Sequence, residues 1–246
     1  MKKIVFLHIP KTGGSTFNNI LQKIGNQKNY NFLQTGFKGY LPNFSFNYFN
    51  VQPKNKLFSG HFVFSDECKN VDLYTLVRDV HKTFFSNLYF KYFYTYIEKK
   101  RNLDNIKRIK DNISFEFTLS ELDIPIIINL LRNNFIASNT FTKTIAGIPY
   151  EKYFFVEKDY KITKADFEIA INNLKYFKLI GDINSFKIFL EKFFSFYDFK
   201  LESYTIKNKG NYDRDFIDLM IQKLNQQIID YNYYDYLLIK EIRKNL

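Results

Sequence analysis

The chain has 246 residues, of which 46% are hydrophobic, and this proportion excludes an intrinsically disordered protein. Lysine and arginine outnumber aspartate and glutamate by 36 to 25. The resulting net charge of +11 favours anionic partners without choosing among nucleotides, acidic glycans, nucleic acid and membrane surfaces. Cys68 is the only cysteine, which excludes an internal disulfide framework and suits a reducing compartment.

Length and hydropathy predict one soluble domain over residues 1–246. The apolar run at residues 4–7 is too short for the core of a signal peptide, and Lys11 soon interrupts it. No part of the sequence approaches the roughly 20 consecutive apolar residues of a membrane-spanning helix. We therefore expect a cytoplasmic protein without a signal peptide or a transmembrane segment.

The chain begins with a predicted strand and a predicted helix. Residues 3–8 (KIVFLH) predict a short buried strand. Between Phe17 and Ile24, apolar residues recur at the i, i+3, i+4, i+7 spacing of an amphipathic helix, which Gly25 would cap. Residues 26–55 are rich in Asn, Tyr, Phe, Gly and Pro without periodicity, and we interpret them as an irregular excursion over the site.

Strands and helices alternate through the rest of the chain. Four more strands are predicted, at residues 57–59, 71–77, 153–157 and 177–181. Helices are predicted to begin near Lys82 and to cover residues 120–136, 185–196 and 214–244. Thr163 and Asp166 match a capping box before a further helix. The charge-dense residues 98–112 indicate solvated helix or loop, with an anion-binding patch as the alternative. The alternation predicts an α/β fold, a single three-layer domain with a mostly parallel central sheet.

Residues 8–17 (HIPKTGGSTF) lie where the first strand ends and the first helix begins. Such a junction presents free backbone N–H groups and the positive end of a helix dipole, and it attracts phosphate. Gly13 and Gly14 would let the backbone curl around an oxygen-rich group, and Lys11 adds a positive charge. Hydroxyl donors are added by Thr12, Ser15 and Thr16. The lysine precedes the glycines, unlike the order in a Walker loop. The alternative is an ordinary glycine turn capped by Ser15.

HIPKTGGSTF closely resembles the 5′-phosphosulfate loop of sulfotransferases that use 3′-phosphoadenosine 5′-phosphosulfate (PAPS). It is most similar to the carbohydrate branch, which includes heparan sulfate 2-O-sulfotransferases and their bacterial relatives. The resemblance implies a P-loop-like phosphosulfate loop that wraps the donor. The resemblance also implies that the loop residues bind the donor. These residues are Lys11, Thr12, Gly13, Gly14, Ser15 and Thr16.

Residues 76–86 (LVRDVHKTFFS) resemble the second motif of the same family, an Arg-Asp-Pro turn followed by a helix that carries a serine. The resemblance implies that Arg78 and Ser86 bind the 3′-phosphate of the donor, with arginine as a planar, bidentate donor. Val80 stands where proline is usual, and Thr83 stands where a second arginine is common. The alternative is that Arg78 only forms a surface ion pair with Asp79.

The three histidines of the chain have different expected roles. His61 lies in SGHFVF, which resembles the G-H-F-x-[FY] segment whose histidine is the proposed base of carbohydrate sulfotransferases. The resemblance implies that His61 and Lys11 are catalytic, and the alternative for His61 is a structural role in its loop. We expect His8 to be a packed, hydrogen-bonded residue and His81 to face solvent.

Weaker similarities to the family extend over nearly the whole chain, at residues 139–147, 177–190 and the C-terminal NYYDYLLIKEI. The resemblance implies transfer of a sulfuryl group from PAPS to a hydroxyl of a glycan or polysaccharide, with 3′,5′-bisphosphoadenosine (PAP) as product and without metal. The eukaryotic relatives are anchored in the Golgi, and no such anchor is predicted in this sequence, so we expect a bacterial-type cytoplasmic location. We expect no nucleic-acid partner. Two alternatives remain open, a P-loop-like nucleotide kinase or nucleotidase and a non-catalytic basic binder of acidic polymers.

Overall fold

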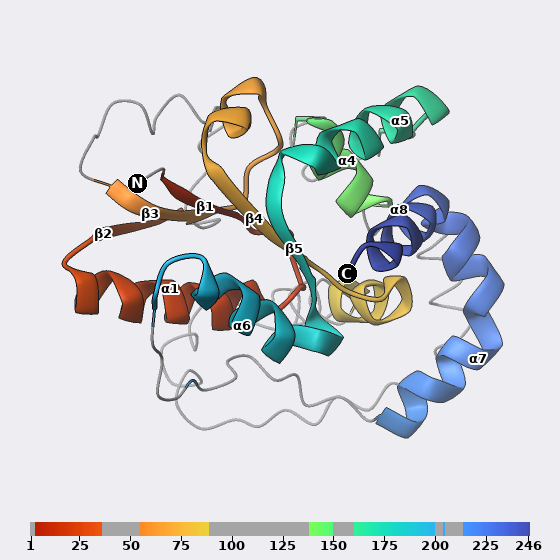
Figure 1. Ribbon diagram of the computed structural model, residues 1–246. Helices are drawn as coiled ribbons and strands as arrows, with labels where there is room; N and C mark the ends of the chain where they lie inside the picture. The colour runs from red at the N-terminus through yellow and green to blue at the C-terminus, as the bar shows by residue number, and fades with distance from the viewer. Residues whose placement is uncertain (1–2, 36–54, 89–137, 150–159, 200–203, 205–213) are drawn as a thin grey trace, which may run out of the picture.

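A computed structural model describes residues 3–35, 55–88, 138–149, 160–199, 204 and 214–246 (Figure 1). Its centre is a sheet of five strands in the order β2-β3-β1-β4-β5, and every neighbouring pair is parallel. The strands are β1 (Ile4–Leu7), β2 (Asn31–Thr35), β3 (Asn55–Gly60), β4 (Asp72–Val77) and β5 (Phe177–Asp182). The predicted α/β fold with a parallel sheet is confirmed.

Strand β1, at the centre of the sheet, is buried on both faces, as its apolar sequence predicts. In β1, Ile4 and Phe6 join the apolar cluster on one face, whereas Val5 and Leu7 join the cluster on the other face. All four side chains are at most 1% exposed. Strands whose two faces are both covered have continuous apolar sequences without polar alternation, and this explains why β1 could be recognised from four residues.

Helices cover both faces and make three layers, as Figure 1 shows. One face is covered by α1 (Gly14–Lys28) and α6 (Phe186–Ser195). The other face carries the helix of residues 80–88, α4 (Thr140–Ala146), α5 (Lys164–Asn173), α7 (Arg214–Tyr231) and α8 (Tyr233–Lys244). Short 3₁₀ turns are η2 (Asp66–Asn70), η5 (Leu174–Tyr176) and η6 (Ile183–Ser185).

Most predicted elements are found within a few residues of their expected places. The capping box before α5 is present, because Thr163 Oγ1 accepts from the Asp166 amide over 3.3 Å and the Thr163 amide donates to Asp166 Oδ2 over 2.8 Å. The predicted helix at 120–136, the predicted strand at 153–157 and the charge-dense residues 98–112 lie outside the described residues. Among the described helices, none combines the length and the apolar character needed to cross a bilayer.

Two predictions in the first third of the chain are wrong. Residues 31–35 form strand β2 inside the segment that we interpreted as irregular, and this edge strand lacks an apolar run because Asn31 and Gln34 are exposed. Gly25 does not end α1, which continues to Lys28 and is capped by Asn29 in the left-handed conformation (φ 54°). The reason for a glycine at position 25 is close packing, since a Cβ there would lie 2.9 Å from the Tyr30 carbonyl oxygen.

The predicted helix at 214–244 is divided at Asn232 into α7 and α8. The division is explained by a reciprocal cap between α4 and α8. Asn139, which precedes α4, accepts through Oδ1 from the amides of Tyr234 and Asp235 in the first turn of α8. Asp235 in turn accepts from the amides of Phe141 and Thr142 in the first turn of α4. Each helix therefore satisfies the otherwise unpaired amides at the start of the other.

Candidate functional site

The candidate site lies at the carboxyl ends of the central strands of the sheet. β1 is flanked by β3 and β4, so the segments that follow these three strands meet at one place. After β1 the chain passes to β2, beyond β3, whereas after β3 it crosses to β4 on the other side of β1. Neighbouring strands whose connections leave in opposite directions form a topological switch point, where open parallel sheets bind ligands. Lys11, His61 and Arg78 follow these three strands.

The loop after β1 has an unusual backbone. Gly13 is the N-cap of α1 in the left-handed conformation (φ 81°), and its carbonyl accepts from the Thr16 amide over 3.0 Å. Lys11 also has a positive φ, 67°, which is unfavourable for a residue with a side chain. Thr12 is fully buried, and its hydroxyl donates to the Ile9 carbonyl over 2.8 Å. The Thr12 hydroxyl hydrogen therefore stabilises the loop itself.

The two glycines of the loop are explained by side chains packed against them. A Cβ at Gly14 would overlap the imidazole of His8, and a Cβ at Gly13 would overlap the side chain of Ile183 in the turn after β5. The absence of a Cβ at these two positions therefore leaves room for His8 and Ile183. The loop amides at the start of α1 are the groups suited to an anion.

Arg78 joins the loop after β4 to the loop after β1. Its Nη1 donates to the backbone carbonyl of Lys11 over 3.2 Å. Both side chains are partly buried. The pKa of Lys11 is lowered to about 8, first because burial disfavours the charged amine and second because Arg78 is near. The structure thus brings close together two cations that the resemblance assigned to two anionic groups of one donor molecule.

The other polar residues of the predicted site lie on the two helices. Ser15 is partly exposed in the first turn of α1, and Thr16 is buried beside it. Ser86 is 5% exposed on the helix of residues 80–88. One turn earlier, Thr83 is also buried, and among the described residues its Oγ1 has no hydrogen-bond partner. Residues three apart share a helix face, so Thr83 and Ser86 lie on the same side of this helix.

His61 forms a pair with His8 on the neighbouring strand end. The two rings are stacked, with centroids 4.1 Å apart and planes at 28°. His61 Nδ1 lies 2.6 Å from the His8 carbonyl oxygen. A carbonyl can only accept, so Nδ1 carries the proton and Nε2 of neutral His61 carries the lone pair.

Both rings of the pair are neutral near pH 7. The pKa of His61 is lowered to about 4 because of burial, while its bond to the His8 carbonyl raises the pKa and the charge of Lys11 lowers it further. The pKa of His8 is lowered well below its usual value, first by burial and then by His61 and Lys11. The expectation that His8 is packed agrees with its place beside Gly14.

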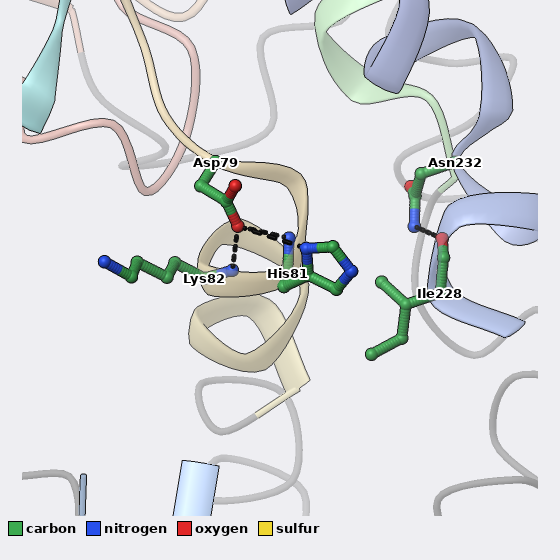
Figure 2. A network of polar contacts seen from close by, with 5 residues as sticks. All are labelled: Asp79, His81, Lys82, Ile228 and Asn232. Carbon is green, nitrogen blue, oxygen red and sulfur yellow. Dashed lines mark hydrogen bonds and ion pairs between the residues drawn. The ribbon is translucent and has the colours of Figure 1, made fainter. Parts of the chain in front are cut away.

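The prediction that His81 faces solvent is wrong, because its side chain is only 12% exposed. Figure 2 shows its ring between Asp79 and the side of α7 that bears Ile228. Asp79 Oδ1 lies 3.2 Å from His81 Nδ1 and also accepts from the amides of His81 (3.0 Å) and Lys82 (3.3 Å). Asp79 is therefore the N-cap of the helix of residues 80–88.

The charges of this cap differ from those of the histidine pair. Burial raises the pKa of Asp79, but the hydrogen bonds from His81 and Lys82 outweigh it and lower the pKa to about 2. The pKa of His81 is raised, mainly by its hydrogen bond to Asp79. Asp79 and His81 therefore stabilise each other's charged forms, whereas the site at the switch point keeps its histidines neutral.

Sequence reasoning missed Asn18, a buried polar residue of α1 that contacts β3. Asn18 Oδ1 accepts from the hydroxyl of Ser59 over 2.5 Å, and Ser59 lies in β3, two residues before His61. Among the described residues, Asn18 Nδ2 has no hydrogen-bond partner. In the sequence, Asn18 is a polar residue next to the apolar stripe of α1. The pattern does not distinguish such a residue from one that is exposed to solvent.

Comparisons of the sequence with protein-family models and with curated proteins find no match. The fold and the side chains therefore define the class. The chain is a three-layer α/β protein whose switch point combines a glycine loop, two neighbouring cations and a neutral histidine pair. Within the described residues, no group of three or more His, Cys, Asp and Glu side chains is arranged to hold a metal ion.

Proposed function

We propose that the chain is a PAPS-dependent sulfotransferase that transfers a sulfuryl group to a hydroxyl of a carbohydrate acceptor. The contact between Arg78 and Lys11 carries the proposal, since it joins the two segments that resemble the donor-binding motifs of one family. Arg78 and Lys11 are 67 residues apart in sequence, so the proximity does not follow from either motif alone.

Donor binding is assigned to both loops. The first-turn amides of α1, Lys11 and the hydroxyls of Ser15 and Thr16 would hold the 5′-phosphosulfate, because a helix N-terminus and a cation both favour a polyanion. Arg78 and Ser86 would hold the 3′-phosphate, where a guanidinium offers a charge-assisted, bidentate contact. In our proposal Thr12 contributes its backbone, because its hydroxyl donates to Ile9.

His61 is the proposed base. As the acceptor oxygen attacks sulfur, its proton passes to Nε2 of His61, which holds the lone pair because Nδ1 donates to the His8 carbonyl. The new oxygen–sulfur bond forms while the bond between sulfur and the bridging phosphate oxygen breaks, and PAP leaves with that electron pair. Lys11 stabilises the negative charge that develops on the leaving oxygen. The residues thus supply positioning, a proton acceptor and charge stabilisation.

Donor binding should also adjust the base. Burial and the charge of Lys11 both keep the pKa of His61 low. A bound phosphosulfate brings negative charge beside Lys11, which would favour protonated His61 and raise its pKa toward a value useful for a general base. His61 is then a stronger proton acceptor with donor present than without it.

The test combines donor binding with transfer. PAP binding is measured by calorimetry, and the purified chain is incubated with PAPS and a glycan array that is scored by mass shift. His61→Ala should abolish transfer and leave PAP affinity within about threefold, because the ring acts on the acceptor proton. Retained turnover in this variant would remove His61 as base, and absence of PAP binding to the wild type would refute the proposed function.

The same experiment separates the alternatives. Transfer that survives EDTA supports sulfuryl transfer, whereas phosphoryl transfer that requires Mg²⁺ would identify a nucleotide kinase. Steeply salt-dependent binding of an oligonucleotide or acidic glycan, without PAP binding, would identify a non-catalytic binder.

A further inference from the structure

We propose that His8 is a positioning residue for His61, and that its ring sets the plane in which the His61 Nε2 lone pair lies. The proposal rests on the proposed function, in which His61 is the base and the loop after β1 binds the donor. In this arrangement His8 contacts no substrate and acts only through His61 and the loop.

The first support is a stack of three rings that runs from the core to the site. Phe6 is fully buried and packs edge-on against Phe17 of α1, with centroids 4.7 Å apart. The His8 ring stacks on Phe6 at 5.7 Å and 24°, and the His61 ring stacks on His8 at 4.1 Å and 28°. Phe6, at the buried end of the stack, is a close-packed core residue. The stack therefore holds His8 in one orientation and gives His61 a flat surface to lie on.

The second support is the backbone of His8, whose amide and carbonyl both bond to residues 60 and 61. Its amide donates to the Gly60 carbonyl over 2.9 Å, and its carbonyl accepts from His61 Nδ1 over 2.6 Å. The residue therefore contacts His61 twice, through its ring and through its carbonyl. Two separate contacts fix both the plane and the tautomer of His61.

The third support is the contact between His8 and the donor loop. The His8 ring occupies the space where a Cβ of Gly14 would lie, in the first turn of α1. The His8 ring thus lies between the donor loop and the ring of His61. A neutral His8 is required there, because a second positive charge beside Lys11 and His61 would be unfavourable, and burial holds its pKa well below the usual value.

The experiment compares His8→Ala with His8→Phe, which keeps a flat ring but has no ionisable group. The chain contains three histidines, so each imidazole resonance in a proton NMR titration is assigned by one substitution. Ile24→Ala is the control, since Ile24 is buried but lies at the opposite end of α1 from the loop. PAP affinity, kcat and the KM of the acceptor are measured for each variant.

We expect His8→Ala to raise the pKa of His61 from about 4 toward its ordinary value, because water replaces the ring. It should lower kcat by about tenfold to a hundredfold through loss of orientation, with PAP affinity within about threefold. His8→Phe should keep the low pKa and recover most of kcat, and Ile24→Ala should leave the pKa of His61 unchanged. If His8→Ala does not fold, His8→Leu replaces it, because Leu fills the space without a flat ring and should lower kcat alike.

An unchanged pKa of His61 and an unchanged kcat in a folded His8→Ala or His8→Leu variant that binds PAP would overturn the inference alone. A kcat for His8→Phe as low as that for His8→Ala would also overturn it. A wild-type chain that does not bind PAP would instead refute the proposed function, and the inference with it.

Discussion

The guanidinium of Arg78 donates from Nη1 to the backbone carbonyl of Lys11 over 3.2 Å. This bond connects the loop after β1 with the end of β4, and it holds Lys11 in a left-handed conformation (φ 67°) that a lysine seldom adopts. It also places two cations at the carboxyl ends of β1 and β4, and two neighbouring cations attract a ligand with several negative charges. Arg78 thus has two roles in the proposed site, as a support for the loop and as a phosphate ligand.

Replacement of Arg78 tests both roles. Arg78→Ala should weaken PAP binding by about tenfold to a hundredfold, since hydrogen bonds to charged groups contribute about 1.5–3 kcal/mol each. Arg78→Lys should recover only part of the affinity, because an ammonium cannot make the bidentate contact. Calorimetry with PAP measures the effect. Lys187→Ala, which removes an exposed charge on α6, is the control and should leave PAP affinity unchanged. Equal affinities for Arg78→Ala and the wild type would contradict the assignment.

The expected pH dependence of kcat/KM for the donor follows from two pKa values in the free protein. In the proposed reaction, His61 accepts a proton only when neutral, which holds above its pKa of about 4. The proposed role of Lys11 requires its protonated form, which holds below its pKa of about 8. We therefore expect kcat/KM to rise with pH near 4, to stay level, and to fall with pH near 8.

Lys11→Arg identifies the group behind the upper limb. Arginine stays charged to far higher pH, so the fall near pH 8 should disappear while the limb near pH 4 stays. Initial rates in a buffer series from pH 3.5 to pH 10 are sufficient. A fall near pH 8 that persists in Lys11→Arg would assign the upper limb to another group.

A paired substitution tests the packing of the donor loop. Gly14→Ala should destabilise the chain by about 1–3 kcal/mol, because its Cβ overlaps a His8 ring that cannot move away from Phe6 and His61. In a His8→Ala background the same Cβ has space, so Gly14→Ala should cost less than half as much. Urea denaturation of the four proteins measures the coupling. Strictly additive costs would show that the His8 ring does not limit position 14.

The reciprocal caps of α4 and α8 predict another coupling. Asn139→Ala should lower the free energy of unfolding by about 1–2 kcal/mol, and Asp235→Ala by about 2–4 kcal/mol because it removes the acceptor of two amides and the Thr142 hydroxyl. The double variant should lose less than the sum, since each residue caps the helix that bears the other. Independent costs in denaturation experiments would contradict this arrangement.

The cap at Asp235 also has a pH dependence with a definite sign. Burial raises its pKa to about 6, although hydrogen bonds from Thr142 and Phe141 and the charge of Lys143 lower it. The folded state then binds a proton more tightly than the unfolded chain, so the contribution of Asp235 to stability falls as pH rises from about 4 to about 6. The cost of Asp235→Ala should therefore be larger near pH 4 than near pH 7. Thermal denaturation at both pH values measures it, and an equal cost would contradict the raised pKa.

Local patterns predicted the parts of this protein that depend on neighbouring residues. The apolar run of β1, the helical spacing from Phe17 to Ile24 and the Thr163 capping box each lie within a few residues, so the sequence determined them. β2 was missed because an edge strand with exposed polar residues has no continuous apolar run. His81 was misjudged because its burial against α7 depends on a helix more than 130 residues later in the chain.

The sequence by itself determined the alternation of strands and helices, and the loops where Lys11, His61 and Arg78 lie at strand ends. Only the tertiary structure decided that β3 and β4 flank β1, which brings the three loops together. It also decided that Gly14 admits the ring of His8 and that Nδ1 of His61 carries the proton. The physical reason is that strand and helix periodicity are local properties, whereas strand order and side-chain contacts depend on pairing between residues far apart in sequence.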